Sequence, residues 1–203
     1  MIDGLAVADP ARVTPVVIFR RLFENEFLTL EGFAISCCGP EDMQYLDDTN
    51  ALASMLEDES SDGLFAPSDP TMHALHRAIY EAWPDVEAVV SGPSLHLRAL
   101  MDEGMALPAP TSMMIKRGVT DLRDHLVGPE ALVAPHLDAT LARARETAAE
   151  HGMKHVLLVA TDGTVCVAGP SPEETMAHYS NVEFAARVEC IRIEETAVHE
   201  FER

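Results

Sequence analysis

The stretch that decides the fold is LHRAIYEAWPDVEAVV, residues 75–90. Its first half continues a segment that starts at Asp69-Pro70, where the aspartate can cap a helix and the proline fits the first helical position. We therefore predict a helix over 70–82. The second half leads into a short apolar run, 86–91, that is followed by Gly92-Pro93. This run predicts a buried strand that the Gly-Pro pair stops.

Apolar periodicity and turn residues predict further elements on both sides of this stretch. Asp162-Gly163 between two apolar runs predicts a β-hairpin, and Ser171 with Glu174 three residues later predicts the start of a helix. Met113 and Met114 are expected in the core. The expected helices cover 11–28, 94–103, 137–151 and 171–188; the expected strands cover 32–39, 155–160, 164–168 and 189–195; and 48–63 is expected to be a helical piece followed by a loop.

Composition limits the classes of function. The 203 residues are 47% hydrophobic, which suits a single domain over 1–203 with a sizeable core. The net charge of -20 would repel phosphate backbones and anionic membranes, so neither nucleic acid nor membrane is an expected partner. The first residues do not resemble a signal peptide, and the four cysteines form no C-x-x-C pair, so we expect a cytoplasmic protein with reduced thiols.

Three segments, in order along the chain, resemble the class II aldolase/adducin family. Residues 33–39 (FAISCCG) are similar to the family's F-L-I-T-P-S-G strand, and residues 75–90 to its L-H-x-A-I-Y, R-P-D-V and A-V-V pattern. Residues 156–174 are similar to its A-L-L-x-x-H-G to S-x-E-E-A segment, and Glu183 with Ala185-Ala186 to its E-x-A-A helix. The resemblance implies an α/β fold, a three-layer α/β/α sandwich with a mostly antiparallel central sheet, in a homo-oligomer that is usually a tetramer.

The resemblance also implies where a catalytic metal would bind. Family aldolases hold a divalent ion with three histidines, and a nearby glutamate handles the proton while the ion acts as a Lewis acid on a sugar phosphate. In this sequence the histidine positions are Ser91, Pro93 and Asp162. The glutamate position is Met72, or Asp69 if the alignment carries a three-residue insertion. One hydroxyl and one carboxylate cannot replace three imidazoles, so we expect neither a metal nor another cofactor.

Other side chains allow two alternative functions. His73 and His76 lie three residues apart on the predicted helix, and with His96 and Asp162 they could form a rearranged metal site for a lyase, epimerase or dehydratase acting on a sugar-like substrate. A metal-free enzyme could instead use Ser91, Asp162 or a cysteine. The simpler interpretations are that His76 is a structural helix residue and that Asp162 favours a turn before glycine.

The leading hypothesis from the sequence is a pseudoenzyme of this fold, which binds a small molecule or serves as an interaction domain. Both enzymatic alternatives stay open at this stage, because a fold does not fix a function. The remnant pocket would be lined by Met72, His76, Ser91, Pro93, His96 and Asp162.

Overall fold

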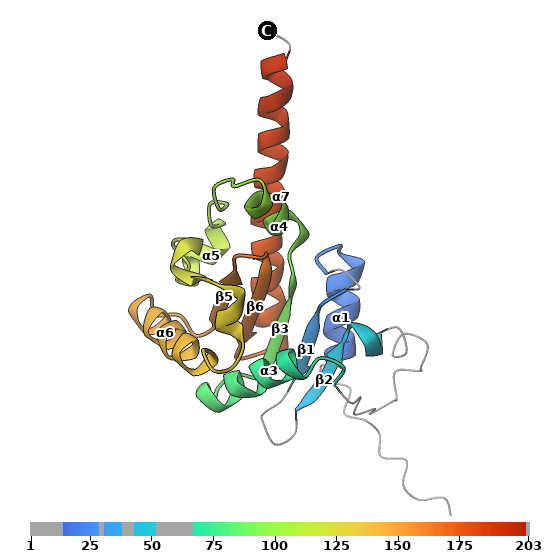
Figure 1. Cartoon of the computed structure of the whole chain (residues 1–203), viewed down its shortest axis with the longest axis vertical. Coiled ribbons are helices and arrows are strands. Elements are labelled where there is room, and N and C mark those ends of the chain that lie inside the picture. Colours follow the sequence, from blue (N-terminus) through green and yellow to red (C-terminus); the bar gives the residue numbers. More distant parts are fainter. Residues whose placement is uncertain (1–13, 29–30, 38–42, 52–66, 202–203) are drawn as a thin grey trace, which may run out of the picture.

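The fold is that of a computed structural model, which describes residues 14–28, 31–37, 43–51 and 67–201. In these ranges one six-stranded sheet lies between two layers of helices, as Figure 1 shows. The expected α/β fold with three layers is therefore confirmed.

The sheet is mixed. Its strands, in the order in which they lie side by side, are β2 (Gln44–Asp47), β1 (Ala34–Cys37), β3 (Ala88–Pro93), β6 (Thr164–Gly169), β5 (Val156–Ala160) and β4 (Leu126–Val127). Each pairing from β2 to β5 is antiparallel, whereas β4 runs parallel to β5. The expectation of a mostly antiparallel sheet thus holds only from β2 to β5.

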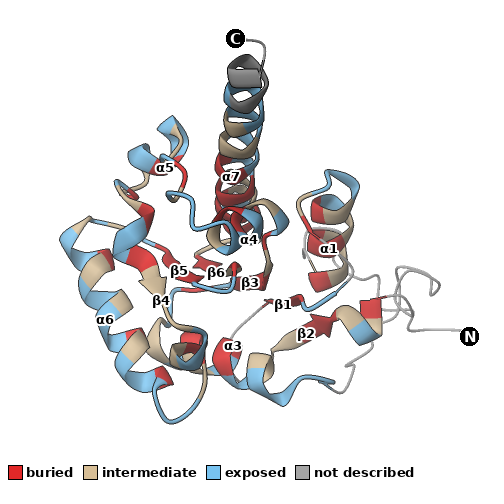
Figure 2. Ribbon diagram, turned by 45° about the horizontal axis from the view of Figure 1, so that its top comes forward, coloured by how far each residue is buried: buried red, intermediate tan, exposed pale blue. Residues whose placement is uncertain are grey.

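Helices cover both faces of the sheet, and neighbouring strand residues alternate between them. Val90 belongs to the apolar cluster on the α7 side, and Val89 belongs to the cluster on the α3 side. Figure 2 shows the buried residues of the strands between the two layers. The first layer contains α1 (Pro15–Glu24), α4 (Leu95–Asp102), α5 (Ser112–Lys116), the 3-10 turn η1 (Leu122–His125) and α7 (Pro172–Phe201); the second contains α3 (Pro70–Ala82), η2 (Pro129–Leu132) and α6 (Leu137–Glu150).

Helix α3 confirms the predicted helix over 70–82. A carboxylate oxygen of Asp69 accepts hydrogen bonds from the backbone N–H of Thr71, at 2.8 Å, and of Met72, at 3.2 Å. The cap satisfies two of the donors that the first turn of a helix leaves free. Asp69 is therefore committed to starting the helix.

Strand β3 differs from the predicted strand at both ends. It runs over Ala88–Pro93 rather than 86–91, so Gly92-Pro93 continues the strand instead of stopping it. The proline is tolerated because β1 pairs with β3 only as far as Ser91, and Pro93 pairs with Thr164 on the other side alone. Its missing N–H therefore removes no bond to β1.

The predicted strand over 189–195 is wrong, because α7 continues through it to Phe201. The β-branched residues of this segment resemble a strand in composition, but their contacts are helical. Cys190 and Ile193, three residues apart, both pack against the core, and Arg192 donates to Glu189 across one turn at 3.0 Å. In the described ranges, every helix is too short or too polar to span a bilayer.

The other local predictions are largely confirmed. Gly152, at φ +63, follows α6, and the N–H of Glu174 donates to the Ser171 hydroxyl at 3.2 Å. Met114 is buried as expected, whereas Met113 is exposed, because the short helix α5 buries only one side. The structure gives α1 within 11–28, β1 within 32–39, a helical turn at 48–51, α4 within 94–103 and the β5–β6 hairpin; residues 38–39 and 52–63 lie outside the described ranges.

Candidate functional site

The three positions that the resemblance assigns to metal ligands converge at one end of the sheet. Ser91 and Pro93 lie on β3, opposite Cys166 and Thr164 of β6. Asp162 lies in the β5–β6 turn, two residues before Thr164. The fold therefore brings these three positions to one end of the sheet, and what they can do depends on what each side chain contacts.

Ser91 lies at the centre of a buried polar chain between α3 and the sheet. Its Oγ is 2.7 Å from Nε2 of His76 and 3.8 Å from Sδ of Met72. On the other side of the imidazole, Nδ1 of His76 is 2.8 Å from Oγ of Ser36, and this hydroxyl is 3.0 Å from the Tyr80 hydroxyl. Ser36, His76 and Ser91 are fully buried.

One direction of hydrogen bonding satisfies every group in this chain. Tyr80 donates to Ser36, Ser36 donates to Nδ1 of His76, Nε2–H of His76 donates to Ser91, and Ser91 donates to the thioether of Met72. The imidazole is neutral in this arrangement. Burial above all, and also the neighbouring His73, lowers the pKa of His76 to about 3.

The other two positions offer little to a metal. Pro93 is half-buried, and its ring carries no donor atom. Asp162 is exposed, and its Oδ1 accepts from the N–H of Thr164 at 2.9 Å. This bond closes the hairpin turn, as the simpler sequence interpretation expected.

The turn itself is fixed against the start of α4. Gly163 has φ +85, and a Cβ placed on it would lie 2.5 Å from Cβ of Arg98. The carbonyl of Gly163 accepts from the N–H of Ser94 at 2.9 Å. Only glycine fits this combination of positive φ and close backbone approach.

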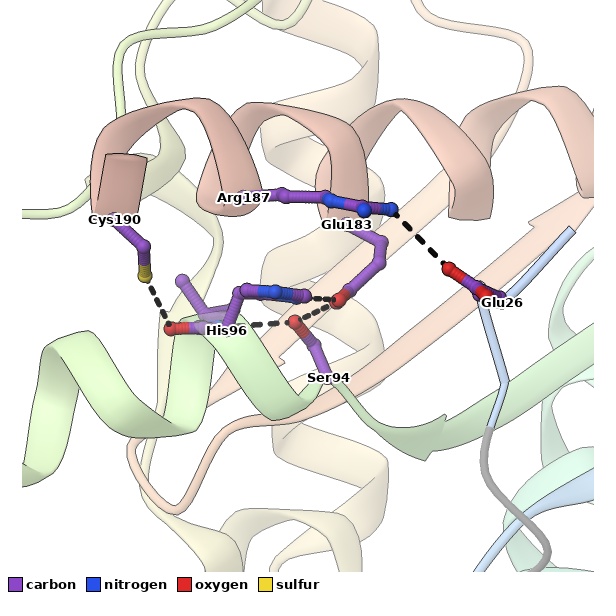
Figure 3. A network of polar contacts seen from close by, with 7 residues as sticks. Glu26, Ser94, His96, Glu183, Arg187 and Cys190 are labelled. Carbon is purple, nitrogen blue, oxygen red and sulfur yellow. Dashed lines mark hydrogen bonds and ion pairs between the residues drawn. The ribbon is translucent and has the colours of Figure 1, made fainter. Parts of the chain in front are cut away.

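His96 belongs to a second polar network, shown in Figure 3. Glu183, from α7, is buried, and its two carboxylate oxygens meet Nδ1 of His96 and the hydroxyl of Ser94. The same hydroxyl accepts from the N–H of Leu97 at 3.1 Å and caps α4. The carboxylate thus lies beside the N-terminus of a helix, where the helix dipole favours negative charge. Cys190 closes the network by donating to the carbonyl of His96 at 3.6 Å.

The structure does not bring His96 together with His73 and His76. His73 and His76 lie on α3, whereas His96 lies on α4 in the opposite helical layer. Both ring nitrogens of His76 are already hydrogen-bonded to serine hydroxyls. No group of three or more His, Cys, Asp or Glu side chains that could hold a metal occurs within the described ranges. The side chains of Ser91, Pro93 and Asp162 therefore do not fit the ion that the family's aldolases bind.

A further histidine pair, which no sequence pattern pointed to, lies between β5 and α7. The rings of His155 and His178 stack with their centroids 3.6 Å apart, and both side chains are buried. Burial above all lowers the pKa of His155 to about 4 and that of His178 to about 3, and the nearby Arg117 lowers both further. The pair is 23 residues apart in the sequence, too far for any local pattern to reveal.

Neither Cys166 nor Cys190 carries an activated thiol. Burial raises the pKa of the Cys166 thiol to about 12 and also raises that of Cys190, beside Glu194 and Glu183. Cys37 is buried, and Cys38 lies outside the described ranges. A thiolate nucleophile needs the opposite environment, with a lowered pKa and access to a substrate. Cys37 and Cys166 are thus buried, and Cys190 is partly buried.

Comparison with known proteins agrees with this fold. The model of the family described as Class II Aldolase and Adducin N-terminal domain matches residues 24–190. An L-fuculose 1-phosphate aldolase structure matches with a TM-score of 0.57 and 16% identity, covering 89% of this chain and 84% of that chain. L-fuculose-1-phosphate aldolase from Thermus thermophilus matches with a TM-score of 0.56 and 12% identity, covering 88% of this chain and 92% of that chain. YgbL from Klebsiella pneumoniae, a putative aldolase/epimerase/decarboxylase, matches with a TM-score of 0.56 and 20% identity, covering 86% of this chain and 85% of that chain. No curated protein matches the sequence.

Proposed function

We propose that this chain, which belongs to the class II aldolase/adducin family, is a non-catalytic member of that family. It acts as a binding domain and does not cleave a sugar phosphate at a metal ion. The observation that carries the proposal is the contact between Ser91 and His76. The first ligand position of the family holds a fully buried hydroxyl whose partner is a structural histidine. A group in this position can neither reach an ion nor reach a substrate.

Loss of one ligand could be compensated, but here the whole donor set has changed. A catalytic divalent ion of this type takes nitrogen or carboxylate ligands in a fixed geometry and keeps one position open. Pro93 has no donor, and the carboxylate of Asp162 already closes a turn. In the preferred register the position of the family's acid is Met72, whose sulfur accepts from Ser91, and in the alternative register it is Asp69, whose carboxylate caps α3. The rearranged site would need His96 and His76 together, and they lie in opposite helical layers.

The Ser91–His76 contact resembles a nucleophile with its base, yet three features oppose this function. Both side chains are fully buried, so no substrate can reach them. The second ring nitrogen faces the hydroxyl of Ser36, not a carboxylate that would orient the ring and stabilise its positive charge. The pKa of His76, about 3, makes the imidazole a poor base at neutral pH.

Metal analysis combined with an aldol assay tests the proposal. We expect protein purified without chelator to hold far less than one transition metal per chain. Added zinc, manganese or cobalt should not induce cleavage of sugar phosphates. The contrary result is stoichiometric metal together with cleavage activity that both His76→Ala and His96→Ala abolish. The control variant His136→Ala, which changes an exposed histidine, should retain that activity. That result would establish the rearranged site as that of a lyase, whereas an epimerase or dehydratase would need assays of its own.

The proposal includes the setting in which such a domain would act. We expect residues 1–203 to form one domain that binds a small molecule or a protein, and the chain to form a homo-oligomer in the cytoplasm. The strong negative charge argues against nucleic acid and membrane partners. A ligand would be sought by measuring thermal shifts with a panel of sugars, sugar acids and sugar phosphates, because the family resemblance points to this chemistry.

A further inference from the structure

Helix α7 has two apolar sides. One side holds Val182, Ala186 and Ile193, which pack against the sheet and the neighbouring helices. The other holds Phe184, Val188 and Ile191, which are 52%, 48% and 48% exposed. We call these last three residues the α7 stripe. They are spaced by four and three residues, which places them along one line of the helix surface.

The α7 stripe lies opposite the side that packs on the core. At 100° per residue, the direction of Val188 is about 160° from that of Ala186 and about 140° from that of Ile193. The helix also projects beyond the sheet towards the C-terminal end, as Figure 1 shows. A helix that is apolar on two opposite sides is typical of one buried between two layers, and within the described ranges this chain supplies only one of them.

The short helix α5, which packs on α7, carries further exposed apolar side chains. The hydroxyl of Thr111, the cap of α5, is 3.2 Å from Oδ1 of Asn181, one turn before Phe184. On α5, Met113 and Ile115 are 44% and 51% exposed. Five of the seven large apolar side chains that are exposed in the described ranges thus belong to α5 and α7. An apolar surface gathered in this way marks an interaction site.

We infer that the α7 stripe binds the α7 stripe of a second copy of this chain, with the two helices antiparallel. The spacing of the stripe follows the d-a-d positions of a heptad repeat, with Phe184 at d, Val188 at a and Ile191 at d. In an antiparallel pair, Val188 packs against Ile191 of the partner subunit, and two-fold symmetry repeats this contact. The interface is isologous and closes at the dimer.

The charges beside the stripe select a second copy and set its direction. In this register Arg187 and Glu194 occupy g positions, and g positions face each other in an antiparallel pair. Arg187 therefore meets Glu194 of the partner subunit, twice. In a parallel pair, Arg187 would instead meet Arg192 of the partner subunit at an e position and be repelled. The stripe thus carries its own complementary charges, although the chain as a whole is strongly acidic.

This inference rests on the proposed homo-oligomer and adds the surface that forms it. It also accounts for the projection of α7. In an antiparallel pair, the end of α7 that extends past its own sheet lies along the outer side of the partner's α7. The same pairing removes from water Val188 and Ile191, which the chain itself leaves half exposed.

Val188→Glu is the first test, because symmetry places this residue in two contacts. Light scattering after size exclusion should give a dimer, or a multiple of it, for the unaltered chain. The variant should dissociate to a smaller species, with a Kd raised by roughly a hundredfold. Ala142→Glu, at an exposed position of α6 in the opposite layer, is the matched control and should leave the mass unchanged. Circular dichroism would show that both variants remain folded.

A charge-reversal cycle tests direction and contact, and it does not depend on removing apolar surface. Arg187→Glu and Glu194→Arg should each weaken the dimer, by roughly threefold to thirtyfold for two symmetric exposed pairs. The double variant should recover most of the lost affinity. Because Arg187 also lies 3.7 Å from Glu26 of its own chain, Glu26→Ala serves as the control and should keep the affinity.

The outcomes separate this inference from the proposal on which it rests. A monomer at high concentration for the unaltered chain overturns both the homo-oligomer and the interface. An oligomer that Val188→Glu leaves intact keeps the homo-oligomer and overturns the α7 interface. Dissociation by Val188→Glu without rescue in the charge-reversal cycle overturns the antiparallel register.

Discussion

Nε2 of His76 lies 2.7 Å from Oγ of Ser91, and this contact connects α3 to the strand position where the family pattern places its first metal-binding histidine. A family histidine there would lie next to His76. The serine instead closes a hydrogen-bonded chain that reaches Tyr80 through Ser36. The side chain at this ligand position is therefore part of the core. The contribution of the contact to the free energy of unfolding can be measured.

His76→Ala should destabilise the fold by roughly 2 to 4 kcal/mol, because it leaves a cavity and two buried hydroxyls without their partner. Arg77→Ala is the control on the same helix. Arg77 is exposed, and its ion pair in the described part of the chain is with Glu81 on the same helix, so its loss should cost no more than about 0.5 kcal/mol. Urea unfolding of the three proteins measures both values. Equal stability of the two variants would contradict a structural role for His76.

Stability should fall as the pH is lowered from about 6.5 towards 4. The pKa is about 3 for His76 and His178 and about 4 for His155, below the value of about 6.5 expected in the unfolded chain. Between these values the unfolded chain binds more protons than the folded chain, so acid favours unfolding. The contribution is complete above pH 6.5 and is lost as the pH falls towards the folded pKa.

Each of these histidines adds up to about 1.4 kcal/mol per pH unit to this dependence. Urea unfolding at constant ionic strength, at several values between about pH 7 and pH 5, measures the slope. His136→Ala, which removes an exposed histidine, should keep the slope of the unaltered protein. His178→Phe should reduce it, because one buried proton acceptor is lost. A free energy of unfolding that does not change over this range would contradict the prediction.

Gly163→Ala should be more harmful than Gly152→Ala, although both glycines have a positive φ. Gly152 has open space where a Cβ would lie, so alanine there should cost about 1 kcal/mol of backbone strain. At Gly163 the new Cβ would also overlap with Arg98, whose Cα would lie only 2.7 Å from it. This overlap should add about 1 to 3 kcal/mol. Similar melting temperatures for the two variants would show that the hairpin can move away from α4.

Asp162 offers a test that separates a turn residue from a metal ligand. Asp162→Asn keeps an oxygen that can accept from the N–H of Thr164, so the free energy of unfolding should change by less than about 0.5 kcal/mol. Asp162→Ala loses the bond and should cost about 1 kcal/mol. Neither variant should alter the metal content. Loss of bound metal in Asp162→Asn would identify the carboxylate as a ligand.

The sequence was most informative where structure depends on neighbours along the chain. The cap at Asp69, the proline that follows it and the apolar spacing to Tyr80 specify α3 without outside help. The hairpin at Asp162-Gly163 is equally local, because the turn needs a residue of this kind before a glycine with positive φ. Local patterns failed at the chain's end, where β-branched residues suggested a strand but α7 continues.

The identity of the side chains at the ligand positions was also fixed by the sequence. The sequence alone shows that these positions hold Ser91, Pro93 and Asp162, so the three imidazole ligands that the family resemblance implies are missing. Only the tertiary structure decided what these residues do instead. Ser91 meets His76 across 15 positions, and Ser94 meets Glu183 across 89. No periodicity carries such pairings, because they depend on how the helices pack on the sheet, and a buried polar group must find its partner wherever the fold brings one within reach.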